Sequence, residues 1–146
     1  MASRSQLETL IDLARRETDD AAKRLGAALK AVEDAVQKLA MLSGYRDDYA
    51  ARFQHSLAGG MTPMAYRNFQ AFLDKLDQAI VGQQEVLRQT RLRGDQEKGL
   101  WQNAERKRMS YTTLADRAQQ EALRSESKRD QKAMDEHAAR QAYYKR

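Results

Sequence analysis

The stretch "HSLAGGMTPMAY" (residues 55–66) decides the fold, because it is the one place in 146 residues where the pattern stops a helix and starts another. Gly59 and Gly60 can adopt the left-handed conformation that ends a helix. Thr62 can cap the next helix, and Pro63, the chain's only proline, suits its first turn. Two long helices joined by so short a connection are expected to run antiparallel, with residue i facing about 119 minus i.

The composition favours helices over any other element. Charged residues make up 32% of the chain, the mean hydropathy is -0.87, and there are only 7 glycines. This composition is typical of long helices rather than of a globular core, and no segment has the pattern of a strand. Without cysteine the chain has no disulfide framework, thiol nucleophile or zinc knuckle. The first residues contain no apolar run long enough for a signal peptide or membrane span, so we expect a cytoplasmic protein.

Upstream of the turn, apolar or small residues recur in alternating steps of four and three. The stripe is Leu7, Ile11, Ala14, Thr18, Ala21, Leu25, Ala28, Val32, Ala35, Leu39, Leu42, Arg46, Tyr49 and Phe53. A heptad repeat sustained over this length predicts one half of a coiled coil. One core position is alanine four times in succession, which predicts closely packed helices.

The segment downstream of the turn carries a second, less regular stripe. Its members are Tyr66, Phe69, Leu73, Leu76, Ile80, Gln83, Leu87, Thr90, Gly94, Trp101, Ala104, Tyr111 and Ala118. We therefore expect an all-α fold, a long antiparallel two-helix coiled-coil hairpin forming one domain over residues 1–146. The first helix should span about residues 5–57, the turn 58–62 and the second helix 63–140, whose C-terminal end should overhang its partner.

Catalytic or metal-binding patterns are not visible. His55 and His137 lie far apart, and the acidic pairs are adjacent in sequence, so their side chains point about 100° apart on a helix. We expect no enzyme activity, no cofactor and no metal. The second half of the chain carries the whole net charge of +5, since residues 1–58 hold nine basic and nine acidic side chains. Acidic residues interrupt its arginine-rich stretch around 88–108, which argues against a nucleic-acid site.

Phe72 lies beside the second stripe rather than in it. Because Phe69, Leu73 and Leu76 form the stripe, Phe72 falls on its flank, where it can form an apolar ridge with Leu76. Two interpretations stay open. Phe72 either widens the helix-helix seam or serves as an exposed anchor for a partner protein.

Four fragments, in this order, resemble the FliJ family of the flagellar type III export apparatus: "LETLIDLARRETDDAAKRLG", "MLSGYRDDY", "NFQAFLDKLDQAI" and "DQKAMDEHAAR". The resemblance spans nearly the whole chain. It implies a coiled coil similar to the central stalk of rotary ATPases. It also implies partners: the hexameric flagellar export ATPase, whose assembly such proteins promote, the cytoplasmic domain of the export gate, and flagellar export chaperones.

The resemblance also implies roles for particular residues. Phe72 and Leu76 would contact the export gate. The end opposite the turn would contact the ATPase through Leu7, Leu10, Asp12, Gln131, Lys132, Met134, Asp135 and Glu136. The protein would then be peripheral to the inner membrane at the flagellar base, through its partners only.

The main alternative is a self-associating structural coiled-coil adaptor unrelated to export. Such an adaptor needs a second apolar stripe along its outer face. Acidic residues occupy off-seam positions of the first helix, including Asp19, Asp20, Glu33 and Asp34, and argue against it. Membrane association is disfavoured because carboxylates dilute the basic face.

Overall fold

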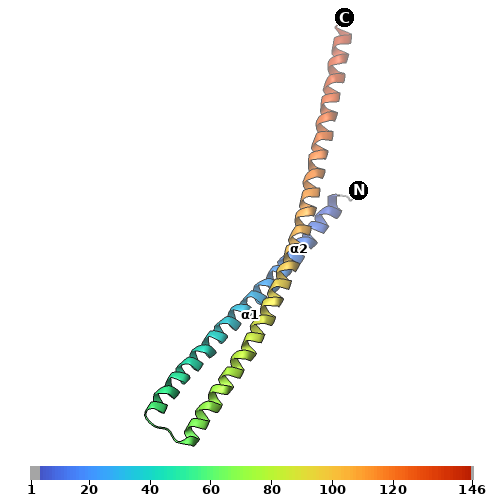
Figure 1. The fold of residues 1–146 in the computed structure, drawn as a ribbon. Helices are drawn as coiled ribbons and strands as arrows, with labels where there is room; N and C mark the ends of the chain where they lie inside the picture. The colour runs from blue at the N-terminus through green and yellow to red at the C-terminus, as the bar shows by residue number, and fades with distance from the viewer. Residues whose placement is uncertain (1–3, 146) are drawn as a thin grey trace. The chain divides into compact units, whose positions relative to one another are not determined.

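The computed structural model describes residues 4–145 and contains two α-helices. Helix α1 spans Arg4–Ala58, helix α2 spans Pro63–Tyr144, and no strand occurs among the residues described. The two helices pack against each other (Figure 1), so the prediction of an all-α two-helix hairpin is confirmed.

The turn between the helices is built as its residues predict. Gly60 has a φ of 93°, in the left-handed region. Gly59 does not adopt a left-handed conformation and continues the last turn of α1. The amide of Gly59 donates to the carbonyl of His55 at 3.3 Å. At the start of α2, Thr62 Oγ1 accepts a hydrogen bond from the amide of Ala65 at 3.2 Å, which is an N-terminal cap.

The chain divides into two compact units, each containing a piece of both helices. One unit is Asp20–Gln102; the other combines Met1–Asp19 with Asn103–Arg146. The prediction that the whole chain behaves as one domain stays a prediction.

The unit Asp20–Gln102 contains the turn and most of the seam. On α1 the alanines of the stripe are nearly inaccessible, with Ala21 exposed by 2% and Ala35 by 5%. The ring of Phe53 packs against that of Tyr66 across the seam, with centroids 5.4 Å apart and ring planes at 51°, which agrees with the expected pairing. The alanine repeat therefore lies in the core of the helix pair, where small side chains favour a close approach of the backbones.

The central part of α2 enters this seam although its sequence looks unfavourable. Gln83 is 7% exposed, and its Nε2 donates a hydrogen bond to the carbonyl oxygen of Ala35 at 3.2 Å. Gly94 is buried, and a methyl group at its Cα would lie 3.8 Å from Val32 Cγ2. The weak stretch of the second stripe is therefore a continuous part of the packed seam.

The other unit joins the first turns of α1 to α2 from Asn103 onward. Ala14 is only 1% exposed here, whereas every residue from Asp116 to Lys145 is exposed. Ala118, which the stripe places in the seam, is thus exposed, because only the first turns of α1 reach that level of α2. The last part of α2 continues beyond them as a solvated helix.

Candidate functional site

The first candidate surface lies near the turn, in the unit Asp20–Gln102. It is a groove of about 370 Å³, which we call the aromatic groove, lined by Tyr45, Asp48, Tyr49, Arg52, Phe72 and Leu76. Both residues predicted to contact the export gate therefore line the same surface. Helix α1 supplies the other side of it, which the sequence had not assigned to a site.

Phe72 combines the two roles that its position in the sequence left open. Its ring contacts Tyr49, with centroids 4.5 Å apart and ring planes at 52°, so it extends the seam. It also stays 45% exposed, and Leu76, one turn further on, is half-buried. An aromatic side chain that is fixed on one face and accessible on the other is suited to anchor a partner.

Tyr45 and Tyr49 are the site residues that sequence reasoning missed. Tyr49 belongs to the first stripe, whose spacing assigns it to the seam, and Tyr45 lies outside that stripe. The two lie one helical turn apart, and Tyr45 is 57% exposed. The signal that could have found them is this spacing combined with the antiparallel pairing, which sets Tyr49 opposite Phe69 and Phe72.

The charges around the aromatic groove balance one another. Asp48 and Arg52 line it, one acidic and one basic. Beside it, Arg46 Nε donates to Asp77 Oδ1 at 3.0 Å and links α1 to α2. This exposed pair links the two helices beside the groove, while the groove itself offers apolar contact rather than a net charge.

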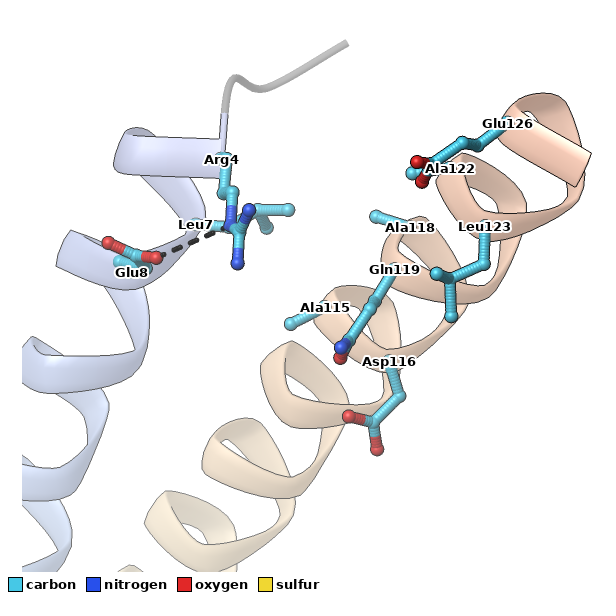
Figure 2. Close-up of a pocket in the computed structure, with 10 residues that line it drawn as sticks. All are labelled: Arg4, Leu7, Glu8, Ala115, Asp116, Ala118, Gln119, Ala122, Leu123 and Glu126. Carbon is cyan, nitrogen blue, oxygen red and sulfur yellow. Dashed lines mark ion pairs between the residues drawn. The ribbon is translucent and has the colours of Figure 1, made fainter. Parts of the chain in front are cut away.

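The second candidate surface lies in the unit that contains the first turns of α1. A groove of about 480 Å³, which we call the terminal groove, opens between α1 and α2 (Figure 2). Its lining residues are Arg4, Leu7, Glu8, Ala115, Asp116, Ala118, Gln119, Ala122, Leu123 and Glu126. In Figure 2, Leu7 of α1 and the alanines Ala115 and Ala118 of α2 point toward one another across it.

The residues predicted to contact the ATPase do not all lie together. Leu7 lines the terminal groove, Leu10 is half-buried nearby on α1, and Asp12 is exposed. The remaining five, which are exposed on α2, are Gln131, Lys132, Met134, Asp135 and Glu136. Gln131 lies five residues beyond Glu126, or roughly 7 Å further along α2. The N-terminal turns thus share a groove with residues 115–126 of α2, whereas the part of α2 that contains the other five lies further along the helix.

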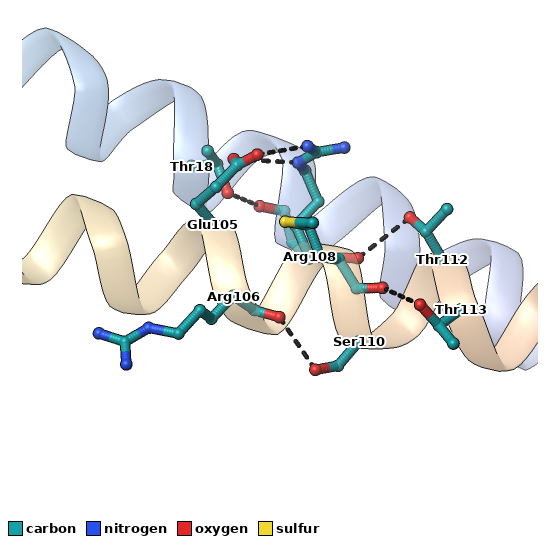
Figure 3. Close-up of polar contacts among 9 residues, drawn as sticks. Thr18, Glu105, Arg106, Arg108, Ser110, Thr112 and Thr113 are labelled. Carbon is teal, nitrogen blue, oxygen red and sulfur yellow. Dashed lines mark hydrogen bonds and ion pairs between the residues drawn. The ribbon is translucent and has the colours of Figure 1, made fainter.

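A set of polar contacts lies near Thr18, in the unit that contains the first turns of α1 (Figure 3). Thr18 Oγ1 donates to the carbonyl of Ala14 at 2.8 Å, which satisfies its buried hydroxyl. Glu105 accepts a hydrogen bond from Arg108 Nε at 3.1 Å, and this bond lowers the pKa of the Glu105 carboxyl. Lys107 Nζ lies 3.5 Å from Glu17 Oε2 and bridges the two helices.

The arginine-rich stretch of α2 is partly neutralised by its own neighbours. Arg88 donates to Glu85 at 3.0 and 2.7 Å, and this hydrogen bonding lowers the pKa of Glu85 and raises that of Arg88. Arg108 is paired with Glu105 in the same i,i+3 geometry. These arginines are therefore engaged within α2.

Residues 4–145 hold no group of three or more His, Cys, Asp or Glu side chains placed to bind a metal ion. Neither helix, over the residues described, has an apolar stretch long enough to cross a membrane.

The fold defines the class of this protein: an all-α coiled-coil hairpin whose exposed apolar grooves suit contacts with other proteins. The family model described as "Flagellar FliJ protein" matches residues 3–146. The chain is 34% identical over 145 residues to a flagellar FliJ protein of Salmonella typhi and 33% identical over 145 residues to that of Escherichia coli (strain K12). Each alignment covers 99% of this chain and 99% of the relative. The chain belongs to the FliJ family, as its sequence fragments predict, and is a component of flagellar protein export.

Proposed function

We propose that this chain is a non-enzymatic component of the flagellar export apparatus that binds the export ATPase and promotes its assembly into hexamers. The same chain couples the ATPase to the cytoplasmic domain of the export gate and escorts export chaperones. It acts in the cytoplasm and reaches the inner membrane at the flagellar base only through these partners. The match to the FliJ family over residues 3–146 carries this proposal.

The arrangement of the two grooves supports a division of roles. The aromatic groove, with Phe72 and Leu76, is the proposed gate contact, and the end that contains Leu7, Leu10 and Asp12 is the proposed ATPase contact. The two grooves share no residue and lie in different units. Two partners can therefore be affected by separate substitutions.

The closely packed seam supports the proposed likeness to the central stalk of rotary ATPases. Ala14, Ala21, Ala28 and Ala35 are all buried, and small residues at a core position favour a thin helix pair. A thin helical hairpin is the kind of element that the centre of a ring can accommodate.

The test measures the hydrolysis rate and oligomeric state of the cognate export ATPase, with and without this chain. We expect faster hydrolysis and more hexamer with the full chain. A truncation after Ala118 should lose both effects. Phe72→Ala should keep both while binding the cytoplasmic domain of the gate at least about tenfold more weakly, as expected for an interface hot spot.

The matched control is Leu92→Ala, since Leu92 is similarly exposed, at 52%, but lies outside both grooves. Leu92→Ala should change neither the effect of the chain on the ATPase nor its affinity for the cytoplasmic domain of the gate. If the well-folded full chain alters neither the rate nor the assembly of the ATPase, the export role proposed here is wrong. A concentration-dependent dimer or tetramer of the chain in the same experiment would then favour the self-associating adaptor.

A further inference from the structure

The floor of the terminal groove continues the apolar seam beyond the part of α2 that α1 covers. Ala115, Ala118 and Ala122 follow the same steps of three and four as the core positions before them. Ala14, at a core position of α1, is 1% exposed, whereas Ala118 and Ala122 are both exposed. The same residue type is thus inaccessible where the two helices are in contact and accessible in the terminal groove, where Leu7 of α1 does not cover the alanines.

The groove stays open because the side chains on its two walls do not fill it. Alanine ends at its Cβ, and Leu7 is the large apolar side chain that α1 directs toward the alanines (Figure 2). Leu123, at the edge of the floor, is 58% exposed. About 480 Å³ remains between the walls. Covering this surface would remove apolar area from water, which favours association.

The lining of the terminal groove is acidic in a chain that is basic overall. Glu8, Asp116 and Glu126 border it, and among the described lining residues Arg4 is the one cation. Arg4 Nε lies 3.7 Å from Glu8 Oε1 and so already compensates one carboxylate. Two carboxylates are left to face an occupant, against a net charge of +5 for the whole chain. The electrostatic complement of this lining is a basic surface.

We infer that the terminal groove binds an amphipathic α-helix of the export ATPase as a third helix against α1 and α2. The apolar stripe of that helix packs on Leu7 and the alanine floor, and its lysines or arginines pair with Asp116 and Glu126. A helix fits because the floor from Ala115 to Glu126 extends over roughly 16 Å, about three helical turns, and its alanines recur in the steps of three and four of a helix-packing seam. This inference rests on the proposed function and names the recognition mode at its ATPase-binding end.

Site-specific cross-linking in the full chain tests the inference. The chain has no cysteine, so Ala118→Cys provides a single attachment point for a photo-activated cross-linker. With the cognate export ATPase as the probe, the label should capture one helical segment with apolar residues at heptad spacing and flanking lysines or arginines. The matched control is Glu121→Cys, which is exposed on the same helix but does not line the groove, and it should capture this segment much less.

Substitutions that fill the groove or reverse its charge give an independent measurement. Ala118→Leu should narrow the groove, lower the affinity for the ATPase at least about tenfold and leave thermal unfolding of the hairpin unchanged or at higher temperature. Glu126→Lys should weaken binding, more so at low salt, whereas the control Glu121→Lys should not.

The outcomes separate the inference from the function on which it rests. If the ATPase binds but cross-links only to the Glu121→Cys label, and Ala118→Leu binds normally, the groove is not the contact and the proposed function stands. Capture of a second copy of this chain at Ala118→Cys would also overturn the inference. If the unlabelled full chain does not bind the ATPase, the proposed function fails and the inference fails with it.

Discussion

The ring of Phe72 on α2 lies 4.5 Å from the ring of Tyr49 on α1, centroid to centroid, and both rings line the aromatic groove. The contact joins the hairpin seam to the proposed gate-binding surface. A substitution on either side should therefore affect both the stability of the hairpin and the shape of that surface.

A double-mutant cycle tests this coupling. Tyr49→Ala and Phe72→Ala should each lower the free energy of unfolding of the hairpin, and the double variant should lose less than the sum of the two. We expect a coupling of about 1 kcal/mol, because an aromatic pair contributes about that much beyond its buried area. Urea denaturation of the four proteins measures it. Strict additivity would show that the two rings act separately.

The buried amide of Gln83 gives a prediction about stability. Gln83→Ala should destabilise the hairpin by about 1–2 kcal/mol, since it removes a hydrogen bond and leaves a cavity. Gln83→Leu should be neutral or stabilising, because the carbonyl of Ala35 keeps its partner within α1 and the apolar side chain fills the seam. Urea denaturation followed by circular dichroism measures both, with exposed Gln84→Ala as the control. A strongly destabilised Gln83→Leu would contradict this account.

Among the glycines of α2, Gly94 lies closest to α1. Substitutions of increasing side-chain size at this position test how closely the two helices pack. A Cβ at this position would lie 3.8 Å from Val32 and 3.9 Å from Leu29, which is ordinary contact, so Gly94→Ala should gain about 1 kcal/mol of helix propensity. Gly94→Leu should instead destabilise by about 1–3 kcal/mol through overpacking.

Gly82 is the matched control for this size test. No atom lies within 4 Å of a Cβ placed there, so both Gly82→Ala and Gly82→Leu should stabilise the hairpin. The thermal unfolding temperatures of the four variants, alanine and leucine at each position, measure the difference between the two sites. Equal behaviour of the two leucine variants would mean that Gly94 is not packed against α1.

The hydrogen bond between Arg108 and Glu105 predicts a pH dependence. Because Arg108 lowers the pKa of Glu105 below its ordinary value of 4.5, the bond stabilises the folded state above that pH. The stabilisation is lost as the pH falls through the lowered pKa. Arg108→Gln should raise the pKa of Glu105 toward 4.5, as followed by carboxyl chemical shifts in an NMR titration. An unchanged titration would show that the bond is not formed in solution.

Two truncations separate the terminal groove from the last part of α2. Ending the chain after Ser127 keeps every residue of the groove but removes Gln131–Glu136, and affinity for the ATPase should fall by less than about tenfold. Ending it after Ala118 removes much of the groove floor and should abolish binding. Equal losses in the two proteins would place the contact beyond Ser127. Thermal unfolding should differ little between them, since the removed side chains are exposed.

Much of the fold can be predicted from local pattern. Every position of the first stripe, from Leu7 to Phe53, is buried or half-buried, including Thr18 and Arg46, which interrupt its apolar character. The reason is that helical periodicity is set by the backbone, so a residue at a core spacing faces the partner helix whatever its polarity. The turn is equally local, because Gly60, Thr62 and Pro63 act on their own backbone.

The candidate sites could be predicted only in part. The position of Phe72 beside the stripe is visible in the sequence, but its contact with Tyr49 depends on which turn of α1 lies opposite. The terminal groove could not be predicted, since it depends on how far the first turns of α1 extend along α2. Ala118 has the spacing of a core residue but is exposed, because only the first turns of α1 reach that level of α2.

The sequence by itself therefore determined the helices, the turn, the seam of α1 and the family. The tertiary structure decided that Tyr45 and Tyr49 complete the aromatic groove, and that the alanine floor near Leu7 is open. The physical reason is that periodicity belongs to one helix, whereas burial depends on the side chains and the length of the helix packed against it.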